Sequence, residues 1–335
     1  MLSLLLAGCG VPGEPLPPLL EIPAAVPDLV AGQVGAHLIL RFTKPQLTTE
    51  STLIRLLDRI EIHGAFLPSD APSESFHEQE RLLATLTPAQ IPDGAGVINY
   101  DLPLEDFQRG MKAVFAVKAI TQRGKDSGFS NLAAVEIADL PEPPADLRVT
   151  LSETAVGLAW SPAGRSAFGG PAPAADGYEV YRSDSSTFAP ARLLATAETP
   201  SYEDKTFQFG VSYVYSVRAF ARRGDSTART PESNRVELAA VDRFAPAAPQ
   251  NLRAIPVPGA VELAWSPGEE SDLDGYNLYR SDGGSFVRAN SNLLPLPLYR
   301  DATVRAGVEY RYEVKAVDQS GNEGPPSEQA SAAGE

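Results

Sequence analysis

The fold of this chain is decided by a stretch near its C-terminus, Gly307-Val308-Glu309-Tyr310-Arg311-Tyr312-Glu313-Val314-Lys315-Ala316. Matching stretches stand at residues 110–119 and 210–219. Repetition at a spacing of roughly one small domain per copy indicates tandem modules. The sequence therefore predicts three modules, a plan that more often provides reach and surface than chemistry.

The earlier strands of each module repeat in the same way. Each copy opens after a proline, where a strand can begin without losing a ladder hydrogen bond. In the second strand, alternation places Val156, Leu158 and Trp160 on one face, and residues 260–267 share the pattern. One face of each sheet is therefore expected to pack a core while the other meets water.

The combined pattern resembles the bacterial fibronectin type III module. It consists of Pro-x-x-Leu, Leu-x-Trp-x-Pro, Gly-Tyr-x-x-Tyr-Arg-Ser, Tyr-x-Tyr-x-Val-x-Ala and a glycine turn, in that order. The resemblance implies an all-β chain of three immunoglobulin-like β-sandwiches, each with seven strands in Greek-key connection. It also implies that Tyr213 and Tyr310 are tyrosine-corner residues, whose hydroxyl groups bond to nearby backbone.

The first module departs from this pattern, so we expect a divergent sandwich there. Phe42 replaces the tryptophan, Ala113 replaces the corner tyrosine, and residues 44–58 form a long segment between strands. Residues 73–81 are a further addition that suits a short helix.

The repeats and the N-terminal stretch divide the chain into four segments. They are a lipoprotein signal with a proline-rich tether at 1–23, a divergent fibronectin type III-like domain at 24–138, and fibronectin type III domains at 141–241 and 245–335. The proline-rich joints are expected to be semi-rigid spacers.

The chain has 28 Lys and Arg against 43 Asp and Glu, a formal charge of −15. Because such a field repels phosphate backbones, we expect no nucleic-acid partner.

The single cysteine, Cys9, closes the segment Leu6-Ala7-Gly8-Cys9, which resembles the lipobox of bacterial lipoproteins. The resemblance implies cleavage before Cys9 and lipidation of its thiol, and two or more acyl chains anchor a protein stably to a membrane. Gly10 rather than Asp follows, which by the same resemblance favours the outer membrane of the cell envelope. A secretory signal ordinarily has a basic start, but no Lys or Arg precedes Cys9. The alternatives are an incidental apolar N-terminus with a free thiol, and a true start further upstream.

The sequence shows no catalytic pattern. His37, His63 and His77 all lie in the first module, but none has the spacing of a metal motif, so we interpret them as surface residues. There is no glycine loop of phosphate-binding type and no Gly-x-Ser-x-Gly elbow. We therefore expect no enzyme activity and no cofactor.

Two loops of the second module contain candidate ligand contacts. Arg223, Gly224 and Asp225 spell the integrin-recognition tripeptide in the last hairpin turn. The sister turns are also polar and contain glycine, so turn chemistry alone accounts for the tripeptide. Phe168 lies in a loop rich in Gly, Ala and Pro, where an aromatic side chain could contact a partner or simply belong to a solvated loop.

Two acidic loops of the third module form a candidate calcium site. The first loop carries four carboxylates, namely Glu269, Glu270, Asp272 and Asp274. Asp318 and Glu323 lie in the last hairpin loop, which meets the first loop at one end of a sandwich. Calcium takes oxygen ligands, but the spacing matches no known calcium loop, so solvated acidic loops are the alternative.

Together, these patterns predict a non-enzymatic envelope lipoprotein whose modules are a spacer and a protein- or glycan-binding surface. A secreted accessory module for polysaccharide degradation is an alternative, because similar modules often stand beside hydrolases. Exposed aromatic residues would favour it, and the candidates are Tyr181 and Tyr279, which alternate away from Tyr178 and Tyr276. A third hypothesis is an enzyme in the divergent first module, although the sequence shows no convergent nucleophile and base.

Overall fold

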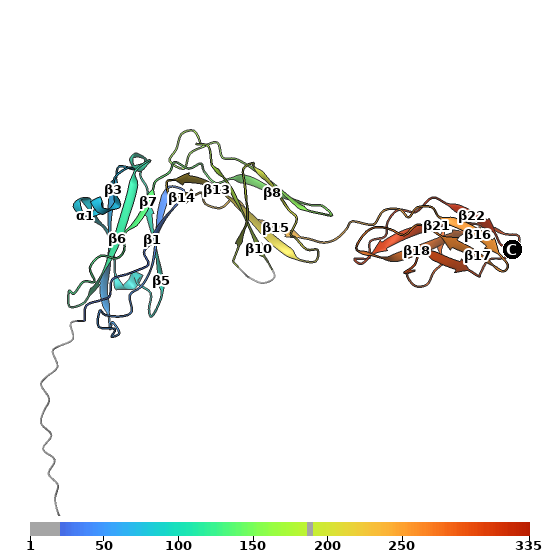
Figure 1. The fold of residues 1–335 in the computed structure, drawn as a ribbon, viewed down its shortest axis with the longest axis horizontal. Helices are drawn as coiled ribbons and strands as arrows, with labels where there is room; N and C mark the ends of the chain where they lie inside the picture. The colour runs from blue at the N-terminus through green and yellow to red at the C-terminus, as the bar shows by residue number, and fades with distance from the viewer. Residues whose placement is uncertain (1–20, 186–189) are drawn as a thin grey trace, which may run out of the picture. The chain divides into compact units, whose positions relative to one another are not determined.

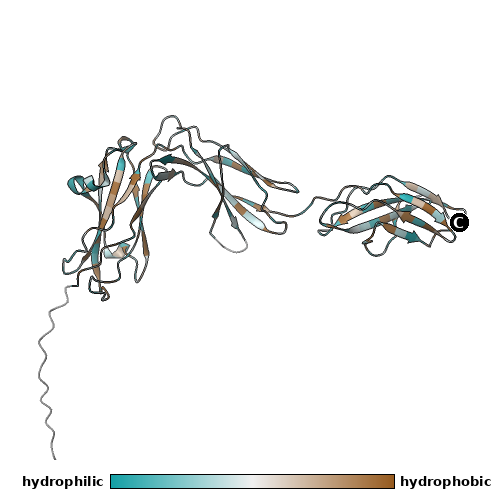
Figure 2. Cartoon of the chain, in the orientation of Figure 1, coloured by the Kyte–Doolittle hydropathy of each residue, from teal (hydrophilic) through white to brown (hydrophobic). Residues whose placement is uncertain are grey.

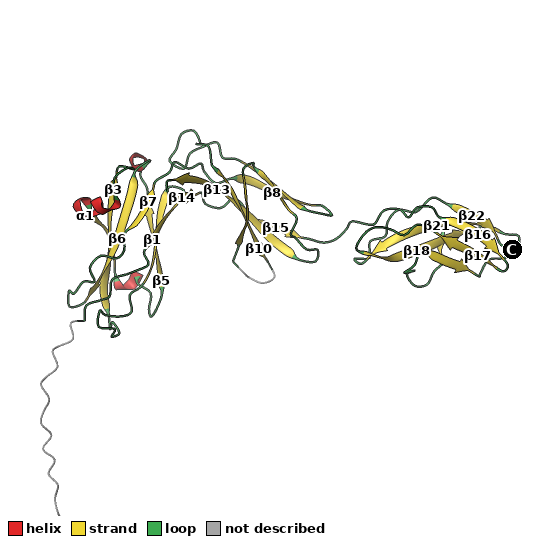
Figure 3. Ribbon diagram, viewed as in Figure 1, coloured by secondary structure: helices red, strands yellow, loops and turns green. Residues whose placement is uncertain are grey.

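The computed structural model describes residues 21–185 and 190–335 of the chain (Figure 1). Strands make up nearly all of its regular structure, and the short helices drawn in red in Figure 3 belong to the first module. Hydrophobic and hydrophilic residues both occur along each strand (Figure 2), as a sheet with one buried face requires. The chain divides into two compact units. One holds the first module and most of the second, and the other holds the third module with short segments of the second.

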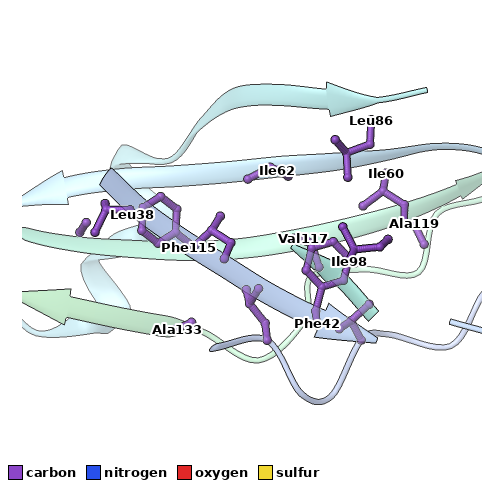
Figure 4. Packing of buried hydrophobic residues seen from close by; sticks show 14 of the residues in the cluster. Leu38, Phe42, Ile60, Ile62, Leu86, Ile98, Phe115, Val117, Ala119 and Ala133 are labelled. Atoms are coloured by element: carbon purple, nitrogen blue, oxygen red, sulfur yellow. The ribbon is translucent and has the colours of Figure 1, made fainter. Parts of the chain in front are cut away.

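The first module is a sandwich of a three-stranded and a four-stranded sheet, both antiparallel. The smaller sheet has the order β1 (Val30–Val34), β2 (His37–Thr43), β5 (Val97–Pro103). The larger sheet has the order β4 (Arg81–Leu86), β3 (Leu57–Leu67), β6 (Lys112–Thr121), β7 (Ala133–Glu136). Inward-facing side chains such as Leu38, Phe42 and Phe115 fill the space between the sheets (Figure 4).

The divergent features of the first module leave this core intact. Phe42 is 1% exposed in the position where tryptophan stands in the other modules. The predicted short helix is present as a 3-10 turn, η1 (Ser73–Ser75), that runs into α1 (Phe76–Gln79) and buries Phe76. Two further 3-10 turns flank β5, namely η2 (Pro88–Gln90) and η3 (Asp106–Gln108).

The second module repeats the sandwich and adds one strand. Its sheets have the orders β12 (Ser201–Asp204), β9 (Val156–Ser161), β8 (Ala145–Leu151), and β11 (Arg192–Ala197), β10 (Gly177–Asp184), β13 (Ser212–Arg223), β15 (Val236–Ala239). The added strand, β14 (Ser226–Arg229), forms a hairpin with β13, and its Arg229 pairs in parallel with Val34 of β1. A sheet of the second module therefore continues into the first, which the sequence repeats did not predict.

The third module is again a sandwich of three and four strands. Its sheets have the orders β16 (Arg253–Val257), β17 (Ala260–Ala264), β20 (Leu298–Asp301), and β19 (Val287–Arg288), β18 (Leu273–Ser281), β21 (Glu309–Asp318), β22 (Ala330–Ala333). The inner face predicted by alternation is confirmed, because Val261, Leu263 and Trp265 are 0%, 2% and 6% exposed. The predicted all-β fold of three fibronectin type III-like sandwiches is thus confirmed. None of the helices among the described residues is long and apolar enough to span a bilayer.

An ion pair between a buried aspartate and a partly buried arginine supports the core of the third module. The Arg280 guanidinium bonds to the Asp301 carboxylate at 2.7 Å, and the hydroxyl of Tyr312 donates to that carboxylate at 3.1 Å. Arg280 also lies 4.9 Å from the ring centre of Tyr310, whose hydroxyl accepts a hydrogen bond from the backbone N–H of Arg305. This bond to backbone a few residues upstream is the predicted tyrosine corner.

The second module has the same ion pair, whereas the first replaces it with apolar groups. In the second module the members are Arg182, Asp204 and Tyr215. Arg182 pairs in register with Tyr215, and the corresponding pair of the first module is Gly64 with Phe115. A buried ion pair and a well-packed apolar group are often of similar stability, so the divergent module can keep the fold without the charges.

Candidate binding surfaces

The lipidation candidate Cys9 lies outside the described residues. The other candidates are placed by the structure, and the two sheet tyrosines stand in equivalent positions of the second and third modules. Both lie on the outer face of the four-stranded sheet, where they are half-buried, while Tyr178 and Tyr276 are 9% and 2% exposed in the core.

In the second module, Tyr181 belongs to a network of charged side chains. Its hydroxyl donates to Glu179 at 2.7 Å, and Arg229 holds the same carboxylate with both Nε and Nη2. The Arg218 guanidinium lies 5.5 Å from the centre of the Tyr181 ring. Burial alone would raise the pKa of Glu179, but the hydrogen bonds from Arg229 and Tyr181 outweigh it and hold the pKa below its ordinary value. Glu179 is therefore an anion on this face at neutral pH.

The third module builds the same arrangement from different residues. The Tyr279 hydroxyl donates to Glu323 at 2.8 Å, and the Asn277 amide donates to the same oxygen at 2.7 Å. The Lys315 ammonium lies 3.3 Å from the other Glu323 oxygen and 4.7 Å from the centre of the Tyr279 ring. The carboxylate thus comes from a loop after β21 rather than from the strand that carries the tyrosine.

In the first module, an imidazole stands in the equivalent position. His63 is 8% exposed, with Nδ1 2.7 Å from Glu80 and Nε2 3.3 Å from Glu61. The Phe129 ring packs edge-on against His63, and Lys118 lies 3.9 Å from the centre of the Phe129 ring. The expectation of a surface histidine is therefore wrong for His63, because Phe129 and the acidic side chains cover it. His37 and His77 are exposed, as expected.

We call the group formed by Tyr181, Glu179 and Arg218, together with its equivalent Tyr279, Glu323 and Lys315, the tyrosine surface. Each copy combines an aromatic ring, a carboxylate and a cation within hydrogen-bonding or stacking distance. Such a combination can stack on an apolar face of a ligand and bond to its hydroxyl groups. The tyrosines were found from alternation. Their partners were missed, although Glu179 stands two residues before Tyr181, the spacing that puts both on one face of a strand.

Gly224 and Asp225 form the turn between β13 and β14, Arg223 is the last residue of β13, and the tripeptide lies beside the first module. Ser226, which follows, accepts a hydrogen bond from the backbone N–H of Glu136 at 3.2 Å. A Cβ atom on Gly224 would lie 2.5 Å from a Glu136 carboxylate oxygen. All three residues of the tripeptide are exposed, but their turn serves the contact between modules.

Phe168 also contacts the first module. Its ring packs at the edge of the first module's core cluster, 5.8 Å from the Arg109 guanidinium. The adjoining Ala167 donates its backbone N–H to the Leu140 carbonyl at 2.8 Å. The loop that carries Phe168 is thus fixed to the joint between the first two modules.

The acidic loops of the third module meet at one end of the sandwich, as expected. Carboxylate oxygens of Asp272, Asp318 and Asp242 all lie within 4.8 Å of one another. Both Asp318 oxygens accept hydrogen bonds from Asn322, at 2.7 and 2.8 Å. Asp242 comes from the segment before the module, so the sequence pattern of the loops did not reveal it.

The remaining acidic candidates are not part of this carboxylate cluster. Glu269 and Asp274 are exposed, and Glu270 accepts a hydrogen bond from the backbone N–H of Ala247 at 2.9 Å. Glu323 bonds to Tyr279 on the tyrosine surface.

The comparisons with known proteins agree with small modules that occur inside larger enzymes. No protein-family model matches the chain. It is 30% identical to Exoglucanase B of Cellulomonas fimi over 156 residues, 45% of this chain and 13% of that protein. It is 38% identical to the amylopullulanase of Thermoanaerobacterium saccharolyticum over 84 residues, 24% of this chain and 6% of that protein. The chain therefore spans only a small fraction of the curated relatives it matches.

Among solved structures, the FN1–FN3 domains of chicken CNTN1 align with 93% of this chain and 99% of that one, at 14% identity and a TM-score of 0.27. This similarity is too low to carry an argument about function or about the placement of the modules.

Proposed function

We propose that this chain is a non-enzymatic protein of the bacterial cell envelope, anchored through a lipid on Cys9, whose tandem modules present a glycan-binding surface. The tyrosine surface carries the proposal, because two modules place a ring and a cation at equivalent positions on the outer sheet face, and in each a carboxylate accepts a hydrogen bond from the tyrosine hydroxyl. Repetition suits a polymer, since two weak contacts on one chain bind a repeating ligand more tightly than either contact alone.

The relatives support a polysaccharide as the ligand class. The matched segments are 13% and 6% of proteins named Exoglucanase B and Amylopullulanase, which is the size of accessory modules rather than of whole enzymes. The stated names point to glucans. We therefore propose glucan chains as the first ligands to examine.

Binding of the full chain to cellulose and starch tests this function. We expect Tyr181→Ala with Tyr279→Ala to lower retention on the polymer at least tenfold, because stacking of a sugar on a ring is worth about 1 kcal/mol or more per site. The control is Tyr181→Phe with Tyr279→Phe, which keeps both rings and should keep most of the binding. Retention that is unchanged by the alanine variant would contradict a role of the tyrosine surface.

A secreted accessory protein is the second candidate, and the relatives' names favour it as much as the anchored form. The two candidates share the tyrosine surface and differ at the N-terminus. An acyl chain on Cys9 supports the anchored form, whereas an unmodified chain in the culture medium supports the secreted form.

A further inference from the structure

One end of the first module carries a group of exposed apolar side chains. Thirteen large hydrophobic residues are exposed in the described part of the chain, and four of these lie at this end. They are Leu47, Leu53, Leu56 and Val97, with exposures of 43%, 76%, 59% and 46%. A cluster of this kind on a soluble module marks an interaction surface more often than scattered single residues do.

Two of the leucines are paired on a small hairpin in the segment between β2 and β3. Leu47 and Leu53 form an antiparallel bridge, and Thr48 donates its backbone N–H to the Thr52 carbonyl at 2.8 Å. Because bridged residues project from the same side of a ladder, the two leucine side chains point in one direction. Leu56 follows at the rim of a groove of about 310 Å³ that Arg55 also lines.

The hairpin is tied to the place where the described chain begins. The Leu47 carbonyl accepts the backbone N–H of Ala24 at 2.9 Å, and Thr49 donates its own to Ile22 at the same distance. In Figure 1 the described chain begins at the lower end of this module. Residues 10–20 connect this point to Cys9, and at ~3.3–3.6 Å per residue they span at most about 40 Å. A lipid on Cys9 would therefore keep the hairpin within reach of the bilayer.

We propose that Leu47, Leu53 and Leu56 insert into the interface of the bilayer that holds the lipid anchor, and so fix the first module against the membrane. This inference rests on the proposed anchoring at Cys9. The exposed Arg55 lies between two of the leucines, where it can meet an anionic headgroup. Burial of apolar side chains would drive the contact, since the net charge of −15 opposes binding to an anionic surface.

Site-specific labelling tests the insertion in the acylated protein. When Cys9 carries lipid, Leu53→Cys supplies the one free thiol, which takes an environment-sensitive fluorophore. After reconstitution into phosphatidylethanolamine and phosphatidylglycerol vesicles, we expect a blue shift and quenching by nitroxide lipids. Phe107→Cys is the matched control, because Phe107 is 76% exposed. Phe107 follows β5, whose Pro103 pairs with His37 at the start of β2, so it lies at the other end of the module.

Equal responses of the two labels would overturn the proposal. A label at position 53 that is already shielded without vesicles, and unchanged by them, would do the same, because it would show that another part of the chain covers the hairpin.

A second measurement separates this inference from the anchor. Flotation of the Cys9→Ser chain with the same vesicles reports the hairpin alone, and adding Leu53→Ser and Leu56→Ser should lower the bound fraction at least fivefold. No decrease would overturn the docking proposal whether or not Cys9 is acylated in cells. Conversely, an unmodified Cys9 in cells would contradict the proposed acylation. The flotation result would still report whether the leucine hairpin binds the vesicles.

Discussion

At the scale of single residues, the third module depends on the charge of Asp301. This side chain is buried, and burial alone would raise its pKa, but the hydrogen bonds from Thr303 and Arg280 outweigh that effect and lower it. A carboxyl group with a lowered folded-state pKa stabilises the fold above its unfolded pKa of about 3.9, and this contribution is lost as the pH falls through the folded value.

We expect Asp301→Asn to destabilise the third module by about 2–3 kcal/mol at pH 7, because it leaves Arg280 partly buried without its anion. The cost should shrink as the pH falls below about 4, because the carboxyl of the unfolded chain is then protonated while the folded carboxyl keeps its charge to a lower pH. In a Trp160→Phe background Trp265 is the remaining tryptophan, so its fluorescence during urea unfolding reports this module. Asp282→Asn, at an exposed aspartate, is the control. A cost that does not change between pH 7 and pH 3 would contradict the account.

If the acidic loops of the third module bind calcium, Asp242, Asp272 and Asp318 are the residues that would hold it, since their carboxylate oxygens lie within 4.8 Å of one another. We expect Asp318→Asn to abolish the heat released when millimolar calcium is titrated into the chain. Asp274→Asn, which changes an exposed acid outside the cluster, should leave it unchanged. A wild-type chain that releases no heat would contradict calcium binding by these loops.

Local alternation predicted the residues of the core but not the partners of the candidate sites. Val261, Leu263 and Trp265 follow a period of two, and that period alone places them inside. Asp242, Glu80 and Glu136 reach their contacts from segments that are distant in sequence, so no local pattern reveals them. The sequence spacing of His63 indicates only that it is not part of a metal motif, and the ring of Phe129 that covers it comes from another part of the module.

At the scale of elements, the hairpin of β13 and β14 is the least expected feature. Its strand β14 pairs with β1, and Gly35 donates its backbone N–H to the Arg229 carbonyl at 2.8 Å. A small apolar cluster of Ala138, Leu140, Ala221 and Ala228 lies beside this pairing. Sequence repeats predict only the features that the modules share. The pairing of β14 with β1 involves one hairpin that only the second module has, so the repeats do not predict it.

We expect Ala228→Asp to open the joint between the first two modules, because it places an unpaired charge in this apolar cluster. Hydrogen exchange should become faster at the amide of Gly35, while amides within the β2 and β5 ladder keep their protection. Ala239→Asp changes an exposed alanine of the same module and is the control. Unchanged exchange at Gly35 in the Ala228 variant would show that the β1 and β14 pairing does not depend on the cluster.

At the scale of the whole molecule, the chain is a set of small sandwiches with a negative net charge and repeated surface chemistry. The net charge of −15 repels phosphate polymers and so disfavours their binding, whereas neutral glycans carry no charge to be repelled. Under the proposed function, repetition of the tyrosine surface in two modules would give a long polymer two places to bind. Both the glycan-binding role in the envelope and the docking of the leucine hairpin depend on where the N-terminus is held.

The most direct test of this account is therefore intact-mass analysis of the protein from the membrane fraction of native cells that express the full gene. We expect the N-terminal residue to be Cys9, with an added mass of at least two acyl chains, and Cys9→Ser to move the protein out of that fraction. An unmodified N-terminus on protein recovered from the soluble fraction would contradict the anchor.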